Sequence, residues 1–374
     1  MDEKIAFALQ NAELRIIKRD FDLMKKIGTQ IQPEVALQLT PYIALYCYEV
    51  IEYMKRKGYD IDIEQTSRYS IKDIRQKAKF FDLSINKLLQ SVDNVDNIQN
   101  QYFIQLMRYP EFGHWNVHNN LGIYFDDENN IVSNSHYAYY VFQDDRSISK
   151  PKDEVKGYDV LGEEVRAFAY DMGTIIGSIS SGLSSISDFI VADFNPNQIV
   201  LHMQDYNTNC CMTDGNDRYK TIRLFLLHVL SSIGLLLFVL KKAIIRETGL
   251  LLRFEYITYH YALLRLDGLR QFCNSHKEVV DDKGLIEMLN CFDFKNEDGI
   301  RKTAFRNCAM HFALIDNKGN PLISEDKLNL AIPYCGLVES QFEITYDEYK
   351  NRLENRLMFL YQKIKDYLSI DMAI

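Results

Sequence analysis

Residues 298–314 read DGIRKTAFRNCAMHFAL, a segment that combines polar and small residues at helical spacing. On a helix of about 100° per residue, Asn307 and His311 lie one turn apart, so the amide can hold the imidazole. Arg306 lies further round the axis, but its long side chain can bend back towards His311. One short helix therefore offers a titratable base, a group that orients it and a permanent cation. Phosphodiester cleavage in RNA needs this set, because a hydroxyl must lose its proton while charge builds up on phosphorus.

The spacing of Arg and His does not by itself single out this pair. Five Arg–His pairs in the chain have four to six residues between them. The pair at 306 and 311 differs in having Asn307 after the arginine and the small residues Cys308 and Ala309 between the polar ones. The alternative interpretation is a helix that exposes Arg306 and buries His311 in the core. The other four pairs are Arg108 with His114, Arg223 with His228, Arg253 with His260, and Arg270 with His276.

Length and composition indicate an ordered protein of two or three domains. The chain has 374 residues and 47% apolar residues, with only seven Pro and 17 Gly, which is typical of globular structure. The start, Met1-Asp2-Glu3-Lys4, does not resemble a signal peptide. The seven cysteines include no Cys-x-x-Cys pair, so they predict neither a disulfide framework nor a zinc knuckle. We expect a cytoplasmic protein with reduced thiols.

Charge is distributed unevenly along the chain. Residues 218–374 carry 22 Lys and Arg against 20 Asp and Glu, whereas the residues before them carry 21 against 32. A net charge of −9 argues against an open, non-specific nucleic-acid surface, because phosphate binding depends on clustered cations. It leaves room for a local basic cleft in the C-terminal part. The acidic N-terminal part is not expected to form the nucleic-acid-binding face.

Residues 1–110 are predicted to be helical, and residues 111–215 to form a mixed α+β module or an insertion. Apolar spacing and turn residues give this division. The first part is expected to have helices over 14–27, 42–54, 70–80, 84–92 and 98–108, the second of these following Pro41 and the third starting with a capping box at Ser70. The second part is expected to have β-prone runs over 121–125, 137–142 and 199–203 and one or two helices over 165–190.

Two patterns in the mixed module suggest sites of their own. His114 and His118 are four apart and could chelate a metal on a helix, with Asp126, Asp127 or His136 as a third ligand; the Gly and Asn residues around them make a helix doubtful. Residues 177–182 read GSISSG but lack the spacing of a phosphate-binding loop, so they predict close helix packing.

Residues 219–374 are predicted to be an all-helical bundle. The segment 219–245 is strongly apolar, but its longest uncharged run, 224–240, is shorter than a usual membrane span of about 20 residues and contains His228 and two serines. A buried central helix is therefore favoured, with no membrane partner. Helices are also expected over 247–272 and 283–292, and the capping box at Thr345 predicts a last helix with one buried face, ending near 368.

This bundle resembles the HEPN superfamily of all-helical RNases. The resemblance rests on the helix order, the late position of the motif helix, and Arg306-Asn307-Cys308-Ala309-Met310-His311. It implies a metal- and cofactor-free endoribonuclease of a toxin or anti-phage system that acts as a homodimer. Arg306 would hold the phosphate, His311 would move the proton and Asn307 would orient His311 or contact the backbone, leaving 2',3'-cyclic phosphate and 5'-hydroxyl ends. Arg301 and Lys302 are added as RNA-binding candidates.

Two other functions stay open at this point. The chain could be a non-catalytic RNA- or protein-binding regulator or scaffold, in which Arg306 and His311 are packing or interface residues. It could also be a metal-dependent hydrolase built on His114 and His118. Under the RNase interpretation, the acidic N-terminal part would sense a signal, dock a partner such as an antitoxin, or inhibit the enzyme.

Overall fold

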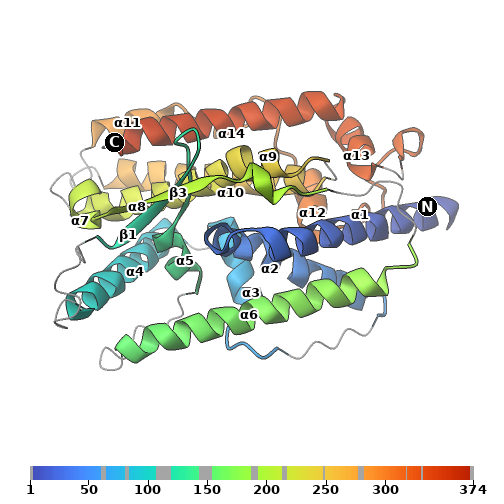
Figure 1. Ribbon diagram of the computed structural model, residues 1–374. Helices are drawn as coiled ribbons and strands as arrows, with labels where there is room; N and C mark the ends of the chain where they lie inside the picture. The colour runs from blue at the N-terminus through green and yellow to red at the C-terminus, as the bar shows by residue number, and fades with distance from the viewer. Residues whose placement is uncertain are drawn as a thin grey trace.

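The computed structural model describes residues 3–59, 65–80, 84–106, 119–142, 154–186, 193–212, 217–246, 249–276, 282–316, 318–329 and 332–370. In this part the chain is mainly helical with one small antiparallel sheet, which confirms the fold class predicted from the sequence (Figure 1). The candidate metal pair at 114 and 118 lies outside the described residues.

The elements follow one another from an N-terminal helical region, through the sheet, to a second run of helices. The helices are α1 (Glu3–Gln30), α2 (Pro33–Arg56), α3 (Ile71–Ile74), α4 (Ile85–Leu106), α5 (Ser135–Phe142), α6 (Glu154–Gly182), α7 (Thr208–Cys211), α8 (Asp217–Gly234), α9 (Lys241–Ala243), α10 (Leu250–Ser275), α11 (Lys283–Asn290), α12 (Thr303–His311), α13 (Pro333–Phe342) and α14 (Tyr346–Leu368). Short 3-10 segments are η1 (Arg75–Lys79), η4 (Pro196–Gln198) and η6 (Glu325–Lys327), and a π segment, η5 (Leu235–Leu240), joins α8 to α9. The strands are β1 (Leu121–Asp126), β2 (Ile131–Asn134) and β3 (Leu201–Tyr206), in the order β2-β1-β3.

Local side-chain bonds explain where two sequence predictions were wrong. The run 137–142 was expected to be a strand but forms α5, because Asn134 Oδ1 accepts a hydrogen bond from the Tyr137 amide at 2.7 Å and so caps a helix. The two helices expected over 84–108 are the single helix α4. Bonds from Asn97 to Asp93 (3.2 Å) and from Asn100 to Asp96 (3.0 Å) span the expected break.

Other local predictions are confirmed or modified. Thr345 Oγ1 accepts from the Glu348 amide at 3.2 Å and starts α14 as expected. Ser70 caps α3, but the helix tightens into η1 and ends at Phe80, which is left-handed with φ 46°. The GSISSG run is part of α6, which packs against α1, and Ser180 Oγ donates to Asp22 Oδ1 of α1 at 2.5 Å. Gly177 itself is not needed for this packing, since a Cβ there would meet nothing within 4 Å.

The central helix of the protein is α8 with its continuation through η5 and α9, and it lies beneath α14 and against α10 and β2 (Figure 1). Residues Tyr219–Ala243 are long and apolar enough to cross a membrane, with a mean hydropathy of 2.2, but 94% of the apolar window is buried within the protein. Such burial is typical of a core helix. Gly234 allows β2 to pass close by, since a Cβ there would lie 2.0 Å from the Ile131 carbonyl oxygen.

The hydrophobic core joins the N-terminal helices to the C-terminal ones. One cluster of buried side chains runs from Leu9 in α1 to Leu368 in α14. Helix α12, which carries the sequence motif, packs against α2, α10 and α13. The motif helix is therefore positioned partly by the first 60 residues of the chain.

Two buried charged groups fasten the end of α12. Arg253 of α10 donates from Nε to the Ala309 carbonyl at 3.0 Å and forms an ion pair with Asp20 of α1, with both side chains fully buried. Its guanidinium lies 3.8 Å from the centre of the Phe312 ring. Glu13 of α1 accepts from the Leu314 amide at 2.9 Å. Because leaving either charge unpaired in the core would cost several kcal/mol, these contacts fix the exit of α12 on α1 and α10.

Candidate functional site

Helix α12 has one face buried in the core and one face partly exposed. Its buried residues are Phe305, Cys308, Ala309 and Met310. The helix ends at His311 because Phe312 adopts a left-handed conformation, φ 58°, and buries its ring completely. Arg306, Asn307 and His311 are consequently left partly exposed on the side that faces away from the core.

A cleft of about 490 Å³ lies over this face of α12. It brings together Arg306, Asn307 and His311, the three residues that the sequence singled out. A short hairpin after α12, closed by the bond from the Leu322 amide to the Leu314 carbonyl (2.8 Å), forms one wall. The full lining is Arg56, Ala304, Arg306, Asn307, His311, Ala313, Ile315, Asp316 and Leu322.

The hydrogen bond expected between Asn307 and His311 is not the one that forms. Asn307 Oδ1 accepts from Arg306, at 3.2 Å from Nε and 2.8 Å from Nη2. The amide therefore orients the arginine and holds its guanidinium against the helix. His311 is drawn instead to an ionisable partner on another helix, because a charge-assisted bond is stronger than one to an amide.

That partner is Glu49 of α2, a residue that the sequence analysis missed. Glu49 Oε2 lies 2.6 Å from His311 Nδ1, and Oε1 accepts from Arg75 Nη1 at 2.8 Å. The Glu49 side chain is only 4% exposed, whereas that of His311 is 43% exposed. One signal could have found it: Glu49 follows Tyr46, Cys47 and Tyr48 on a strongly apolar helix, where a carboxylate requires a partner.

Arg301 and Lys302, the added RNA-binding candidates, are engaged outside the cleft. Arg301 Nη2 donates to the Phe294 carbonyl at 2.8 Å. Lys302 Nζ donates to the Gln341 carbonyl and lies 5.2 Å from the centre of the Phe342 ring. Arg56, which the sequence analysis did not select, is the additional cation that lines the cleft. Contact of Arg301 and Lys302 with RNA stays a prediction.

His260 of α10 lies close enough to α12 for the charge of Arg306 to affect its pKa. Burial lowers the pKa of His260 to about 4, with smaller contributions from the positive charges of Arg301 and Arg306. The imidazole is therefore neutral at neutral pH. Its ring stacks near Tyr256, with the ring centres 6.0 Å apart, and it serves as a packing group of α10.

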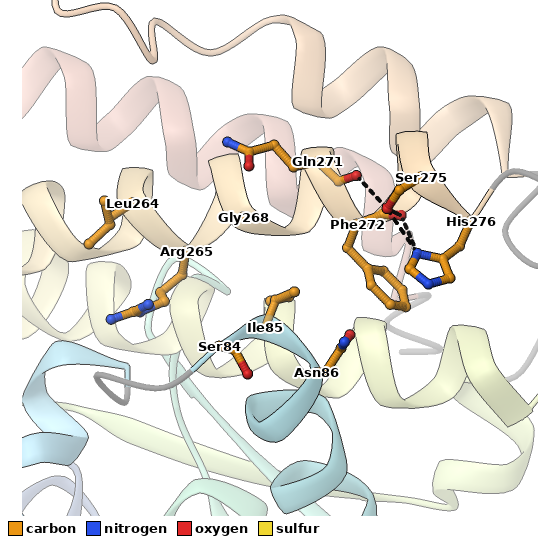
Figure 2. A pocket seen from close by; sticks show the side chains of 10 residues that line it. All are labelled: Ser84, Ile85, Asn86, Leu264, Arg265, Gly268, Gln271, Phe272, Ser275 and His276. Atoms are coloured by element: carbon orange, nitrogen blue, oxygen red, sulfur yellow. Dashed lines mark hydrogen bonds between the residues drawn. The ribbon is translucent and has the colours of Figure 1, made fainter.

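Another groove in the described part of the chain lacks this combination of groups. Figure 2 shows a groove between the start of α4 and the second half of α10, lined by Arg265 and His276 among others. There the Nδ1 atom of His276 lies within hydrogen-bond distance of Ser275 Oγ (2.9 Å) and of the Phe272 carbonyl oxygen (3.0 Å). No carboxylate lines this groove.

The described residues contain no group of three or more His, Cys, Asp or Glu side chains that could hold a metal ion. Of the third ligands proposed for the histidine pair at 114 and 118, Asp126 pairs with Lys242 at 3.3 Å and His136 is buried against His228. Both side chains thus have other partners.

Comparison of the chain with protein-family models, with curated proteins and with solved structures finds no match.

Proposed function

We propose that this protein is a metal-independent endoribonuclease, which cleaves RNA by attack of the 2'-hydroxyl on the adjacent phosphate. The observation that supports this most is the shared cleft, which is lined by both Arg306 and His311 of α12, each held by a second group. A guanidinium offers two parallel donors to phosphate oxygens, and an imidazole can exchange a proton near neutral pH.

In the proposed reaction the 2'-oxygen attacks phosphorus and the bond to O5' breaks. His311 takes the 2'-hydroxyl proton or gives a proton to the leaving O5'. Arg306 binds the non-bridging oxygens as negative charge builds up on them, and Asn307 keeps the guanidinium in place. The products are a 2',3'-cyclic phosphate and a 5'-hydroxyl, because the nucleophile belongs to the substrate.

The proposed active form is a homodimer with the two α12 clefts facing each other. One imidazole can serve as base or as acid, and two facing copies can serve as both. Pairing also brings two Arg306 side chains to one phosphate backbone, which suits a chain whose net charge is −9. The proposed cytoplasmic toxin or anti-phage setting, with an antitoxin or regulator as partner, rests on the resemblance of the motif segment.

The test is to incubate the full-length protein with a mixed RNA pool in EDTA and to analyse the ends of the fragments. We expect cyclic-phosphate ends from wild type and a loss of at least about 100-fold for Arg306→Ala and His311→Ala. His276→Ala removes a histidine from the other groove, and Arg352→Ala removes an exposed arginine on α14 that pairs with Glu348. Both controls should cleave like wild type.

Equal cleavage by His311→Ala and wild type would overturn the assignment. Loss of cleavage in EDTA that returns with a divalent ion would overturn the metal-free mechanism. If wild type binds RNA but leaves it intact, the regulatory binding protein becomes the better interpretation.

A further inference from the structure

Glu49 occupies an unusual position for a carboxylate, because it is almost fully buried and divides its two oxygens between two helices. Oε1 accepts from Arg75 in η1 at 2.8 Å and Oε2 lies 2.6 Å from His311 Nδ1 in α12. The Arg75 guanidinium is itself held over the Tyr48 ring, 3.8 Å from its centre. The carboxylate is therefore fixed from both sides and presents one oxygen to His311.

This arrangement determines which ring nitrogen of His311 carries the proton. A carboxylate can only accept, so the bond requires a proton on Nδ1, and a neutral imidazole then has a bare Nε2. Nε2 makes no hydrogen bond to any residue within the described ranges. Because His311 lines the cleft and is 43% exposed, this nitrogen is free to meet a ligand there.

We propose that Glu49 is the positioning residue of His311, so that the N-terminal helix α2 completes the catalytic site; this rests on the proposed function. Glu49 holds the ring in the tautomer whose Nε2 can take the 2'-hydroxyl proton. As the imidazolium forms, the adjacent carboxylate balances its charge and leaves the proton on Nδ1. Arg75 prevents the carboxylate from rotating away.

The geometry of α2 supports a shared role for its residues at the cleft. Glu49 and Arg56 are seven residues apart, so they lie on one face of the helix, about two turns from each other. Glu49 reaches His311 and Arg56 lines the cleft beside it. One face of α2 thus supplies both a positioning carboxylate and a cation, although the acidic N-terminal part was expected to lie away from RNA.

The first experiment compares Glu49→Gln with wild type in steady-state RNA cleavage. Removing the charge while keeping the shape should lower kcat about 100-fold, within the usual range for general acid–base catalysis, and leave KM unchanged because Glu49 does not touch RNA. Glu52→Gln is the matched control, since Glu52 is on the same helix but, among the described residues, pairs only with Lys55, at 3.9 Å. Glu49→Asp should recover part of kcat. The proposal would be overturned if Glu49→Gln left kcat unchanged or altered only KM.

A second measurement does not depend on RNA cleavage or on the Glu49 variants. Nitrogen-15 NMR of histidine-labelled wild type, recorded over a range of pH, should show that the neutral His311 ring carries its proton on Nδ1 and has a bare Nε2. His311→Ala identifies the signals. An Nε2-protonated ring would overturn the inference even if the protein cleaves RNA. An Nδ1-protonated ring in a protein that never cleaves RNA would instead overturn the proposed function, and with it the catalytic role of Glu49.

Discussion

Acid should destabilise this protein through a pair of buried histidines. His136 of α5 and His228 of α8 meet in the core, with Nδ1 of the first 2.8 Å from Nε2 of the second. Burial lowers the pKa of His136 to about 3, with a smaller contribution from Lys220. Burial also lowers the pKa of His228 well below 6.5, helped by His136 and Lys77. Both rings are neutral in the folded protein.

The sign and size of the effect follow from proton binding. In the unfolded chain each histidine titrates near pH 6.5, so below that pH the unfolded state binds protons that the folded state excludes. The free energy of unfolding then falls by about 1.4 kcal/mol per pH unit for each histidine. Between about pH 7.5 and about pH 5 the pair costs about 4 kcal/mol, a large part of a typical stability of about 5–15 kcal/mol.

Urea unfolding followed by circular dichroism, at about pH 7.5 and about pH 5, measures this loss. The double variant His136→Gln, His228→Gln keeps groups that can hydrogen bond but cannot titrate. Its loss in free energy of unfolding between the two pH values should therefore be about 4 kcal/mol smaller than that of wild type. His202→Gln, on the exposed strand β3, should behave like wild type. An unchanged pH dependence in the double variant would refute the reasoning. Cleavage assays should accordingly stay above about pH 6.

Three further outcomes separate the roles of individual residues. Arg56→Ala should raise KM for RNA and lower the slope of log affinity against log salt by about 1, whereas Lys302→Ala should change both less; titration at several salt concentrations measures this. Gly234→Ala should lower the free energy of unfolding by about 1–3 kcal/mol, since its Cβ would overlap the main chain of β2. Arg253→Met should cost about 3–5 kcal/mol because it removes the buried guanidinium that pairs with the buried Asp20 carboxylate, and adding Asp20→Leu should recover most of that loss; urea unfolding tests both.

Features that depend on neighbouring residues were predictable from the sequence. Thr345 caps α14 through the Glu348 amide three residues on, and the spacing of apolar residues along that helix marked its buried face. Arg306 and His311 share a cleft because they lie on one short helix. By contrast, aromatic residues over 137–142 favoured a strand, and the cap supplied by Asn134 outweighed that preference.

The partner of His311 could not be predicted in this way. Glu49 is 262 positions away from it, so no periodicity or spacing along the chain relates the two residues. Only the packing of α12 against α2 brings them together. Asn307 was the reasonable local partner, but the carboxylate binds the imidazole more strongly, and the amide turns to Arg306 instead. The identity of the motif is thus local, whereas its chemistry depends on tertiary structure.

Three carboxylates of the acidic N-terminal part are paired inside the protein and add little negative charge to the cleft. These carboxylates, Glu13, Asp20 and Glu49, are buried and point towards the C-terminal part of the chain. A buried carboxylate that is paired with a cation adds little to the field outside the protein. The net charge therefore overstates the repulsion that RNA would meet at α12, where Arg56 and Arg306 line the surface. The cations that pair with the three carboxylates are Lys57, Arg253 and Arg75.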